Sequence, residues 1–195
     1  MSGYQSSREK VEKNVPAELR ARRQWVGYVF VQDPPKSPDE EPPKPRKVPL
    51  DPKPTPRFDG RVASSSDPST WGTFDQACEG VEKYRFVGVG YVFAADDPYC
   101  GFDFDDVREP RTFTDIEGRI SVEGYFVKGV AQQALDKIAP YGYAEISPSG
   151  TGIHVILKGT LPRKQAKRTM PDGWSVEAYS AERYFTITGD EWGAS

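Results

Sequence analysis

Apolar and polar positions alternate in short runs along much of the chain, which is typical of strands that bury one face. Early runs predict strands at residues 25–31, 86–93 and 99–106. In the second half of the chain the same pattern predicts four more strands, at residues 143–147, 153–158, 174–179 and 183–188. We expect the last two of these to form a β-hairpin.

Apolar positions spaced three and four residues apart predict helices between these strands. One follows Thr73 and Gln76, which have the spacing of a capping box, and another covers residues 127–138. A shorter helix is expected at residues 15–22, with Asn14 as its N-cap. Together the elements predict an α+β domain with a mixed or antiparallel central sheet and flanking helices.

The length of 195 residues supports one domain, 1–195, with a core large enough to fold alone. Residues 33–60 hold ten of the eighteen prolines, so we expect an extended surface loop or a partly disordered insert there. No apolar run approaches the length of a membrane span, and the first residues lack the apolar stretch of a signal peptide. Cys78 and Cys100 lack zinc-site spacing, which indicates reduced thiols in a cytoplasmic protein.

The segment 101–106 carries the most informative chemistry. In a strand, Asp103 and Asp105 point to one face, and Phe102 and Phe104 point to the other. Neighbouring carboxylates repel each other, so a counter-charge is expected, and Mg²⁺ or Mn²⁺ ions are natural candidates. A solvated strand edge or a cluster of helix-capping aspartates explains the local pattern equally well.

His154, the chain's single histidine, follows a turn of small residues that contains Ser149, Gly150 and Gly152. Glycines allow close approach of the backbone, and exposed N–H groups suit phosphate oxygens. A lone histidine is otherwise a packed or surface side chain. Glu177 lies on a later strand and would add a third carboxylate to the aspartate pair, as a two-metal phosphoryl-transfer site requires. Alone, Glu177 is an ordinary strand residue.

The net charge of −3 does not indicate strong non-specific nucleic-acid binding. Positive charge is local instead, at Arg163, Lys164, Lys167 and Arg168, which we expect in a loop between the histidine and Glu177. This loop is the best candidate for a template path, and a solvated charged face is the alternative. Lys47, at the end of the proline-rich segment, has the reach to contact a phosphate or is simply solvated.

The order Asp-x-Asp, Ser-Gly-x-Gly-x-His and a strand Glu resembles the archaeo-eukaryotic primase superfamily. Within it, the chain is most similar to the bifunctional primase-polymerase domains of phages, plasmids and mobile elements. Further segments carry the resemblance, at residues 24–26, 47–51, 63–71, 88–90 and 183–189. The resemblance implies a core like that of RNA-recognition modules. It also implies metal ligation by Asp103, Asp105 and Glu177, and nucleotide binding by the Ser149–Gly150–Gly152 turn, His154 and Arg183.

The expected function is therefore DNA primase and DNA polymerase activity, by nucleotidyl transfer with two Mg²⁺ or Mn²⁺ ions. The implied partners are NTP or dNTP, a single-stranded DNA template with its primer, and a helicase module in a longer parent protein. No membrane partner is expected. A metal-dependent nuclease that uses the same carboxylates, or an inactive nucleotide- or nucleic-acid-binding module, remains an alternative. A rolling-circle nicking enzyme normally presents paired histidines, which this chain lacks.

Overall fold

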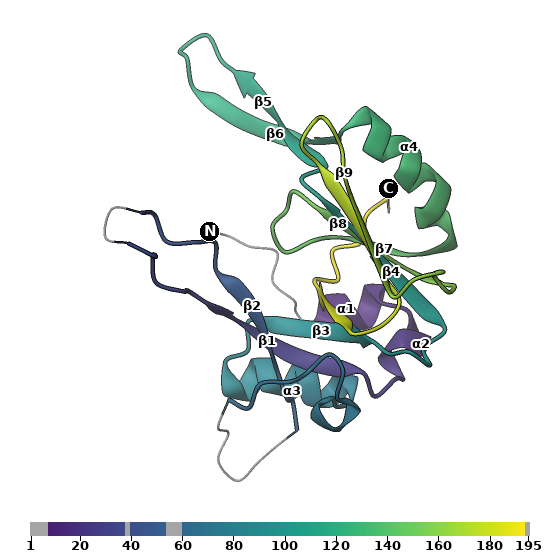
Figure 1. The fold of residues 1–195 in the computed structure, drawn as a ribbon. Coiled ribbons are helices and arrows are strands. Elements are labelled where there is room, and N and C mark those ends of the chain that lie inside the picture. Colours follow the sequence, from purple (N-terminus) through teal and green to yellow (C-terminus); the bar gives the residue numbers. More distant parts are fainter. Residues whose placement is uncertain (1–7, 38–39, 54–59, 194–195) are drawn as a thin grey trace.

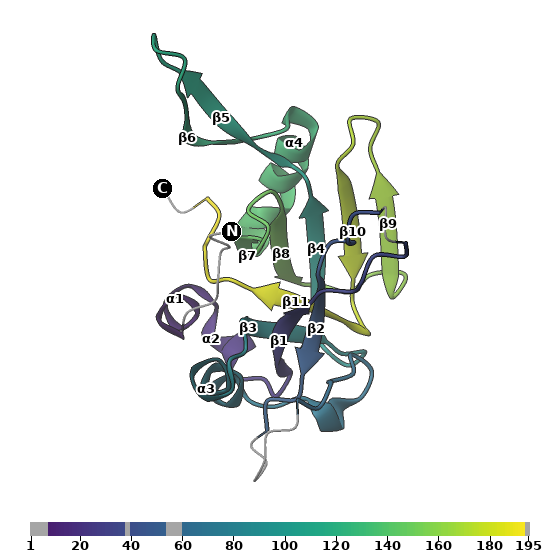
Figure 2. The same ribbon diagram turned by 90° about the vertical axis from the view of Figure 1, so that its left-hand side faces the viewer.

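Two antiparallel sheets and a projecting hairpin organise the chain in the computed structural model, which describes residues 8–37, 40–53 and 60–193 (Figures 1 and 2). The four-stranded sheet has the order β11–β3–β1–β2, with bounds Arg183–Ile187, Gly88–Phe93, Trp25–Val31 and Arg46–Leu50. The five-stranded sheet has the order β7–β8–β4–β10–β9, with bounds Gly142–Ile146, Ile153–Lys158, Tyr99–Asp105, Ser175–Tyr179 and Gln165–Thr169.

Four α-helices are described: α1 (Arg8–Asn14), α2 (Ala17–Arg20), α3 (Phe74–Tyr84) and α4 (Gly129–Ile138). Two short 3₁₀ turns, η1 (Pro68–Thr70) and η2 (Ala139–Tyr141), complete the set. α3 packs on β1 and β3 and begins with the predicted capping box, in which the Thr73 hydroxyl accepts from the Gln76 N–H. α4 covers the face of the five-stranded sheet that carries Phe104 and Val155, using Ala131 and Leu135.

The two sheets share one core. Trp25, Tyr91 and Phe93 of the four-stranded sheet belong to the same buried cluster as Ile156 and Tyr179 of the five-stranded sheet. Aromatic rings in this cluster pack mostly edge to face, for example Phe93 against Phe185 with centroids 5.0 Å apart. In Figure 2, β11 runs across β4, and the rings of Phe93 and Phe185 lie against Gly101, so the sheets meet along the acidic strand. The α+β class is confirmed, with two antiparallel sheets in place of one central sheet.

The predicted hairpin of the last two strands is wrong. β10 pairs with β4 and β9, whereas β11 pairs with β3 in the other sheet. Between them, Glu182 adopts a left-handed conformation (φ 58°), and its N–H donates to the carbonyl of Phe93. The chain therefore leaves one sheet and enters the other within three residues, so this corner ties the two sheets together.

Other elements also differ from expectation. The N-terminal helix is two short helices, and Asn14 ends α1, where its side chain donates to the carbonyl of Gly189 at 2.7 Å. The basic segment expected as a loop forms β9, an edge strand. Within the proline-rich segment 33–60, β2 is also an edge strand, a position that tolerates proline. Residues 38–39 and 54–59 of that segment lie outside the described residues.

A hairpin of β5 (Arg108–Thr114) and β6 (Ile120–Val127) was not predicted. It leaves the end of the acidic strand β4 and projects from the body of the molecule (Figure 1). Its apolar side chains are largely exposed, including Phe113, Ile120 and Val122. In the described part of the chain, no helix has the length and apolar character that crossing a bilayer requires.

Candidate active site

One row of polar residues crosses all five strands of the larger sheet. Each residue of this row lies directly opposite the next one on the neighbouring strand. Side chains paired in this way point to the same face of the sheet. From β7 to β9 the row consists of Glu145, His154, Asp103, Glu177 and Lys167. The sequence predicted four of these side chains as site residues: Asp103 and Glu177 for metal, His154 for nucleotide and Lys167 for the template. The sheet registers bring these four into adjacent positions.

His154 is buried at the centre of this row, with 3% of its surface exposed. Its Nδ1 lies 3.3 Å from Glu145 Oε1, and its Nε2 lies 3.5 Å from Asp103 Oδ1. The ring also stacks on Phe185 of β11, with centroids 4.8 Å apart. Burial alone would lower the pKa of His154, but the two carboxylates outweigh burial and raise this pKa. The imidazole is thereby kept cationic to higher pH than usual.

Glu145 is a site residue that sequence analysis missed. It is fully buried, and its carboxylate accepts hydrogen bonds from the N–H groups of Thr188 and Gly189 and from the Tyr143 hydroxyl at 2.7 Å. A buried carboxylate needs such partners. The available signal was a glutamate within an otherwise apolar predicted strand, at residues 143–147.

The aspartate pair has the properties of a cation site. Asp103 Oδ1 is buried and has no hydrogen-bond partner within the described structure, although His154 lies nearby. Asp105 is more exposed; loss of hydration and then the charge of Asp103 raise its pKa. An orphaned carboxylate oxygen beside a second carboxylate fits a divalent metal ion, which would supply the missing positive charge.

The carboxylate of Glu177, unlike Asp103 Oδ1, has hydrogen-bond partners among the described side chains. Its carboxylate accepts hydrogen bonds from Lys167 Nζ and from the Tyr179 hydroxyl, and Arg183 lies 3.8 Å away. Burial would raise the pKa of Glu177, but these partners outweigh it and lower the pKa. No three or more His, Cys, Asp or Glu side chains in the described ranges group as a metal site. To bind a metal ion together with the two aspartates, Glu177 would first have to give up its ion pair with Lys167.

The turn before β8 lies at the far end of β4. Ser149 Oγ lies 2.9 Å from Ser147 Oγ, and Gly150 has a positive φ of 78° that suits glycine. A Cβ at Gly152 would lie 2.7 Å from Ser147 Oγ and 2.8 Å from the carbonyl oxygen of Phe104. The hydroxyl of Thr151 donates to Asp106 at 3.2 Å, which places the turn beside the end of the acidic strand.

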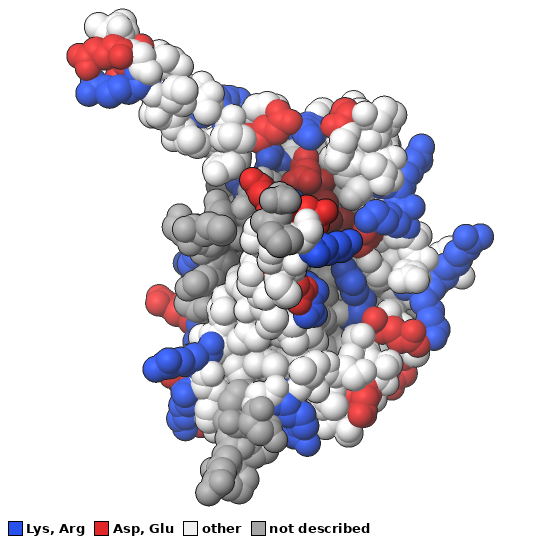
Figure 3. Space-filling model, turned by 60° about the vertical axis from the view of Figure 1, so that its left-hand side comes forward, with Lys and Arg blue, Asp and Glu red and all other residues white. Residues whose placement is uncertain are grey.

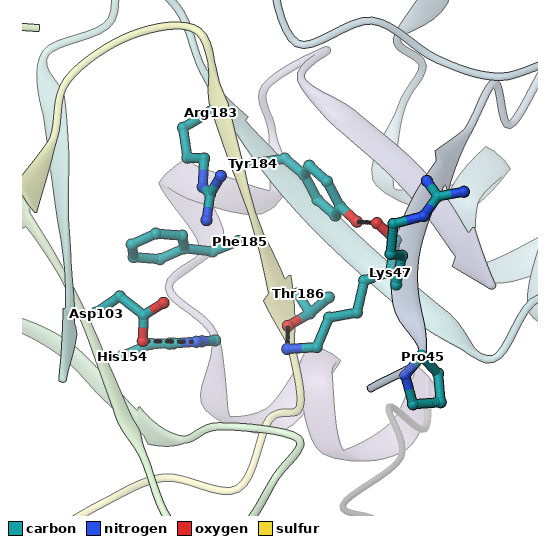
Figure 4. A pocket seen from close by; sticks show the side chains of 9 residues that line it. Pro45, Lys47, Asp103, His154, Arg183, Tyr184, Phe185 and Thr186 are labelled. Atoms are coloured by element: carbon teal, nitrogen blue, oxygen red, sulfur yellow. Dashed lines mark hydrogen bonds and ion pairs between the residues drawn. The ribbon is translucent and has the colours of Figure 1, made fainter. Parts of the chain in front are cut away.

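A pocket of about 420 Å³ opens next to the row, between the two sheets (Figure 4). Asp103 and His154 form the wall on the five-stranded sheet. The wall on the four-stranded sheet comes from β11 and from the start of β2, through residues Arg183, Tyr184, Phe185, Thr186, Pro45, Arg46 and Lys47. Arg183 and His154 thus line the same pocket, whereas Ser149, Gly150 and Gly152 do not line it.

The basic residues of the predicted template path have different surroundings. Lys164 pairs with Glu182 at 2.5 Å and Lys167 pairs with Glu177. Arg163 and Arg168 have no ion pair with any described residue. Lys167 lies opposite Glu177 and Arg168 opposite Val176, so these two side chains project from opposite faces of the sheet. Figure 3 shows acidic side chains gathered in a hollow below the projecting hairpin, with Lys and Arg at its border.

Comparison with known proteins bears on this arrangement. No protein-family model matches the chain. A DNA primase-polymerase of Nitratiruptor phage NrS-1 is 37% identical over 145 residues, which cover 74% of this chain. The resemblance to a primase-polymerase domain of phage type is confirmed. The chain spans 18% of the length of that relative, so the similarity concerns one part of a much longer protein.

Proposed function

We propose that this chain is a single catalytic domain, residues 1–195, that performs template-directed nucleotidyl transfer as a DNA primase and polymerase. The observation that carries the proposal is the registered row of His154, Asp103 and Glu177 beside a pocket that also holds Arg183. The similarity of this chain to a phage DNA primase-polymerase supports the same activity. The substrates would be NTP or dNTP and a single-stranded DNA template with its primer.

Asp103 and Asp105 would hold two Mg²⁺ or Mn²⁺ ions, with Glu177 as the third carboxylate. Such ions activate a 3′-hydroxyl for attack on the α-phosphate and stabilise the leaving pyrophosphate. The Asp103 oxygen without a hydrogen-bond partner among the described residues and the raised pKa of Asp105 support this role, because a bound cation would coordinate the first and favour the ionised form of the second. Without a bound metal ion, Lys167 neutralises the charge of Glu177.

The protein's own groups would position the triphosphate. The ring of His154 is held on one side by Glu145, and Arg183 stacks over Tyr179 with its guanidinium 4.8 Å from the ring centroid. Both side chains are therefore restrained before a nucleotide arrives, which reduces the entropy lost on binding. The Ser149–Gly150–Gly152 turn, which lies beside Asp106 at the end of the acidic strand, would add further phosphate contacts there.

Template binding is proposed for Arg163, Lys164, Lys167 and Arg168 on and beside β9. The two arginines are the stronger candidates, because the lysines already have carboxylate partners. Since the chain spans 18% of its relative's length, we also propose a helicase module in a longer parent protein as a partner. For such a replication protein the cytoplasm of a prokaryotic host is the proposed location.

Substitution of the aspartates tests the catalytic proposal. Asp103→Asn and Asp105→Asn keep side-chain size but remove the anionic ligands, so each should reduce primer extension by ~10³-fold or more. Extension is measured on a primed single-stranded template with labelled nucleotides and Mg²⁺ or Mn²⁺. The thermal midpoint of each variant establishes that the fold is retained. Asp96→Asn, an exposed aspartate outside the site, is the matched control and should extend normally.

The same assay separates the alternatives. Lengthening of the primer supports nucleotidyl transfer, and shortening of either strand supports a metal-dependent nuclease. Retention of labelled nucleotide or DNA without chemistry supports a binding module. Extension near the wild-type rate by Asp103→Asn or Asp105→Asn would remove the carboxylates from the catalytic role.

A further inference from the structure

Lys47 is a lysine in an unusual electrostatic position. It extends from β2 into the pocket, where its Nζ donates to Thr186 Oγ1 at 3.5 Å, the upper limit for a hydrogen bond (Figure 4). Within the described residues it has no carboxylate partner. Many other lysines of the chain do: Lys10, Lys53, Lys83, Lys128, Lys158, Lys164 and Lys167.

Although Lys47 as a whole residue is exposed, its ammonium group loses part of its hydration where it reaches into the pocket. Burial lowers the pKa of Lys47, whereas the negative charges of Asp103 and Asp105 oppose that shift. Desolvation of a charged group is unfavourable unless hydrogen bonds or an opposite charge compensate for it. An ammonium has three donors, and a single long hydrogen bond to Thr186 leaves most of this capacity available for an anion.

The backbone presents this side chain firmly. Lys47 is paired with Phe30 in the β1–β2 ladder, and its carbonyl accepts a hydrogen bond from the Tyr184 hydroxyl at 2.7 Å. Tyr184 and Phe185 of β11 line the same pocket. The lysine therefore reaches the pocket from the four-stranded sheet, while His154 reaches it from the five-stranded sheet.

Charge in the pocket is arranged in two groups. Lys47 and Arg183 are cationic donors beside the ring of His154, and Asp103 with its neighbour Asp105 provides the carboxylates. A triphosphate carrying a divalent cation has the complementary pattern, with anionic oxygens for the donors and a cation for the carboxylates. The volume of about 420 Å³ lies within the range of small-molecule sites.

We propose that Lys47 is a phosphate ligand of the incoming nucleotide and that the triphosphate bridges the two sheets between Lys47 and His154. This inference rests on the proposed function, since it assigns a further ligand in the same site. The role proposed for Lys47 is phosphate binding, whereas the basic residues on and beside β9 are proposed to bind the template.

Direct binding tests the assignment without turnover. Lys47→Met keeps the length of the side chain and removes its charge, and Lys47→Arg keeps the charge. Inorganic triphosphate and a dNTP with Mg²⁺ are each titrated into the protein by calorimetry, without template. Loss of one charge-assisted hydrogen bond to phosphate should raise Kd for both ligands by about 10- to 150-fold in Lys47→Met, and Lys47→Arg should recover most of the affinity.

Lys83→Met is the matched control. It removes the same charge from the surface of α3, where Lys83 pairs with Glu79, and it should leave both Kd values unchanged. Affinity for single-stranded DNA should be equal in Lys47→Met and wild type. Unchanged triphosphate affinity in Lys47→Met overturns the assignment, as does an equal loss in Lys83→Met or a loss confined to DNA binding.

The two proposals fail in different ways. A wild-type protein that binds triphosphate through Lys47 but never extends a primer contradicts nucleotidyl transfer and retains the phosphate ligand. A protein that extends primers normally, with identical triphosphate affinity in wild type and Lys47→Met, contradicts the role of Lys47 and retains the polymerase.

Discussion

His154 has a feature of each of the two alternatives that the sequence left open, since it is packed and it also lines the pocket. It is packed, because its ring stacks on Phe185 and is almost fully buried. It is also a wall of the pocket, between Glu145 and Asp103. Packing and ligand binding are therefore not exclusive at this position, since burial is what holds the ring in one orientation.

Replacement of His154 by Ala should consequently affect stability and substrate binding together. Loss of the ring leaves a cavity beside Phe185 and removes the imidazole partner of the buried Glu145, so the free energy of unfolding should fall by roughly 3 kcal/mol. Nucleotide Kd should rise by about 10- to 150-fold, as expected for one lost charge-assisted hydrogen bond. Thermal melting and nucleotide titration on one preparation measure both effects. Normal nucleotide affinity in the folded fraction would restrict His154 to a structural role.

For single residues, the alternation of apolar and polar positions predicted which face of a strand each side chain occupies. The shared face of Asp103 and Asp105 follows from a period of two, and the β4–β10 register places Glu177 beside Asp103. The roles assigned to these residues remain predictions. The role of Glu145 was beyond the pattern, and the pattern could not decide whether Lys47 reaches a phosphate or is solvated, because both depend on which side chains meet across strands far apart in sequence.

Among the elements, strand positions were more predictable than strand partners. The segments that became β1, β8, β10 and β11 were all expected, yet β10 and β11 lie in different sheets. A short connection between two strands favours a hairpin, and here the left-handed Glu182 turns the chain into the other sheet instead. The β5–β6 hairpin escaped prediction because it projects from the core, so that burial does not impose a clear alternation on its strands.

β9 allows an element-scale test of template binding. Arg163→Gln with Arg168→Gln removes two cations that have no ion pair with described residues. If both contact phosphates, the slope of log affinity for single-stranded DNA against log salt should become shallower by about 1.4. Fluorescence anisotropy at several salt concentrations measures the slope, and Lys83→Met serves as a charge-matched surface control for one cation. An unchanged slope would make β9 a solvated edge strand without a role in template binding.

At the scale of the whole molecule, the pocket lies where two sheets meet. A ligand bound between Lys47 and His154 would contact both sheets and so stabilise their association. At a concentration of 100 times its Kd, a nucleotide adds about 2.7 kcal/mol to the stability of the folded state. For a chain of this size that corresponds to a rise in Tm of roughly 5–11 °C.

Thermal melting with a dNTP and Mg²⁺, without DNA, measures this rise. The matching nucleoside lacks phosphates and should give little or no shift at the same concentration. Lys47→Met should need a higher nucleotide concentration for the same shift. Equal shifts from nucleoside and nucleotide would place the binding energy outside the phosphate contacts and contradict a triphosphate bridge.

The row from Glu145 to Lys167 has a consequence for how such a protein can change over generations. Each member is aligned with the next by strand register, and a slip of one residue turns every side chain of a strand to the opposite face. Gain or loss of one residue within β4 would therefore exchange Asp103 for an apolar neighbour. Length variation should accumulate instead in the β5–β6 hairpin, whose tip at Gly118 lies outside this alignment. The site constrains the spacing of residues as strictly as it constrains their identity.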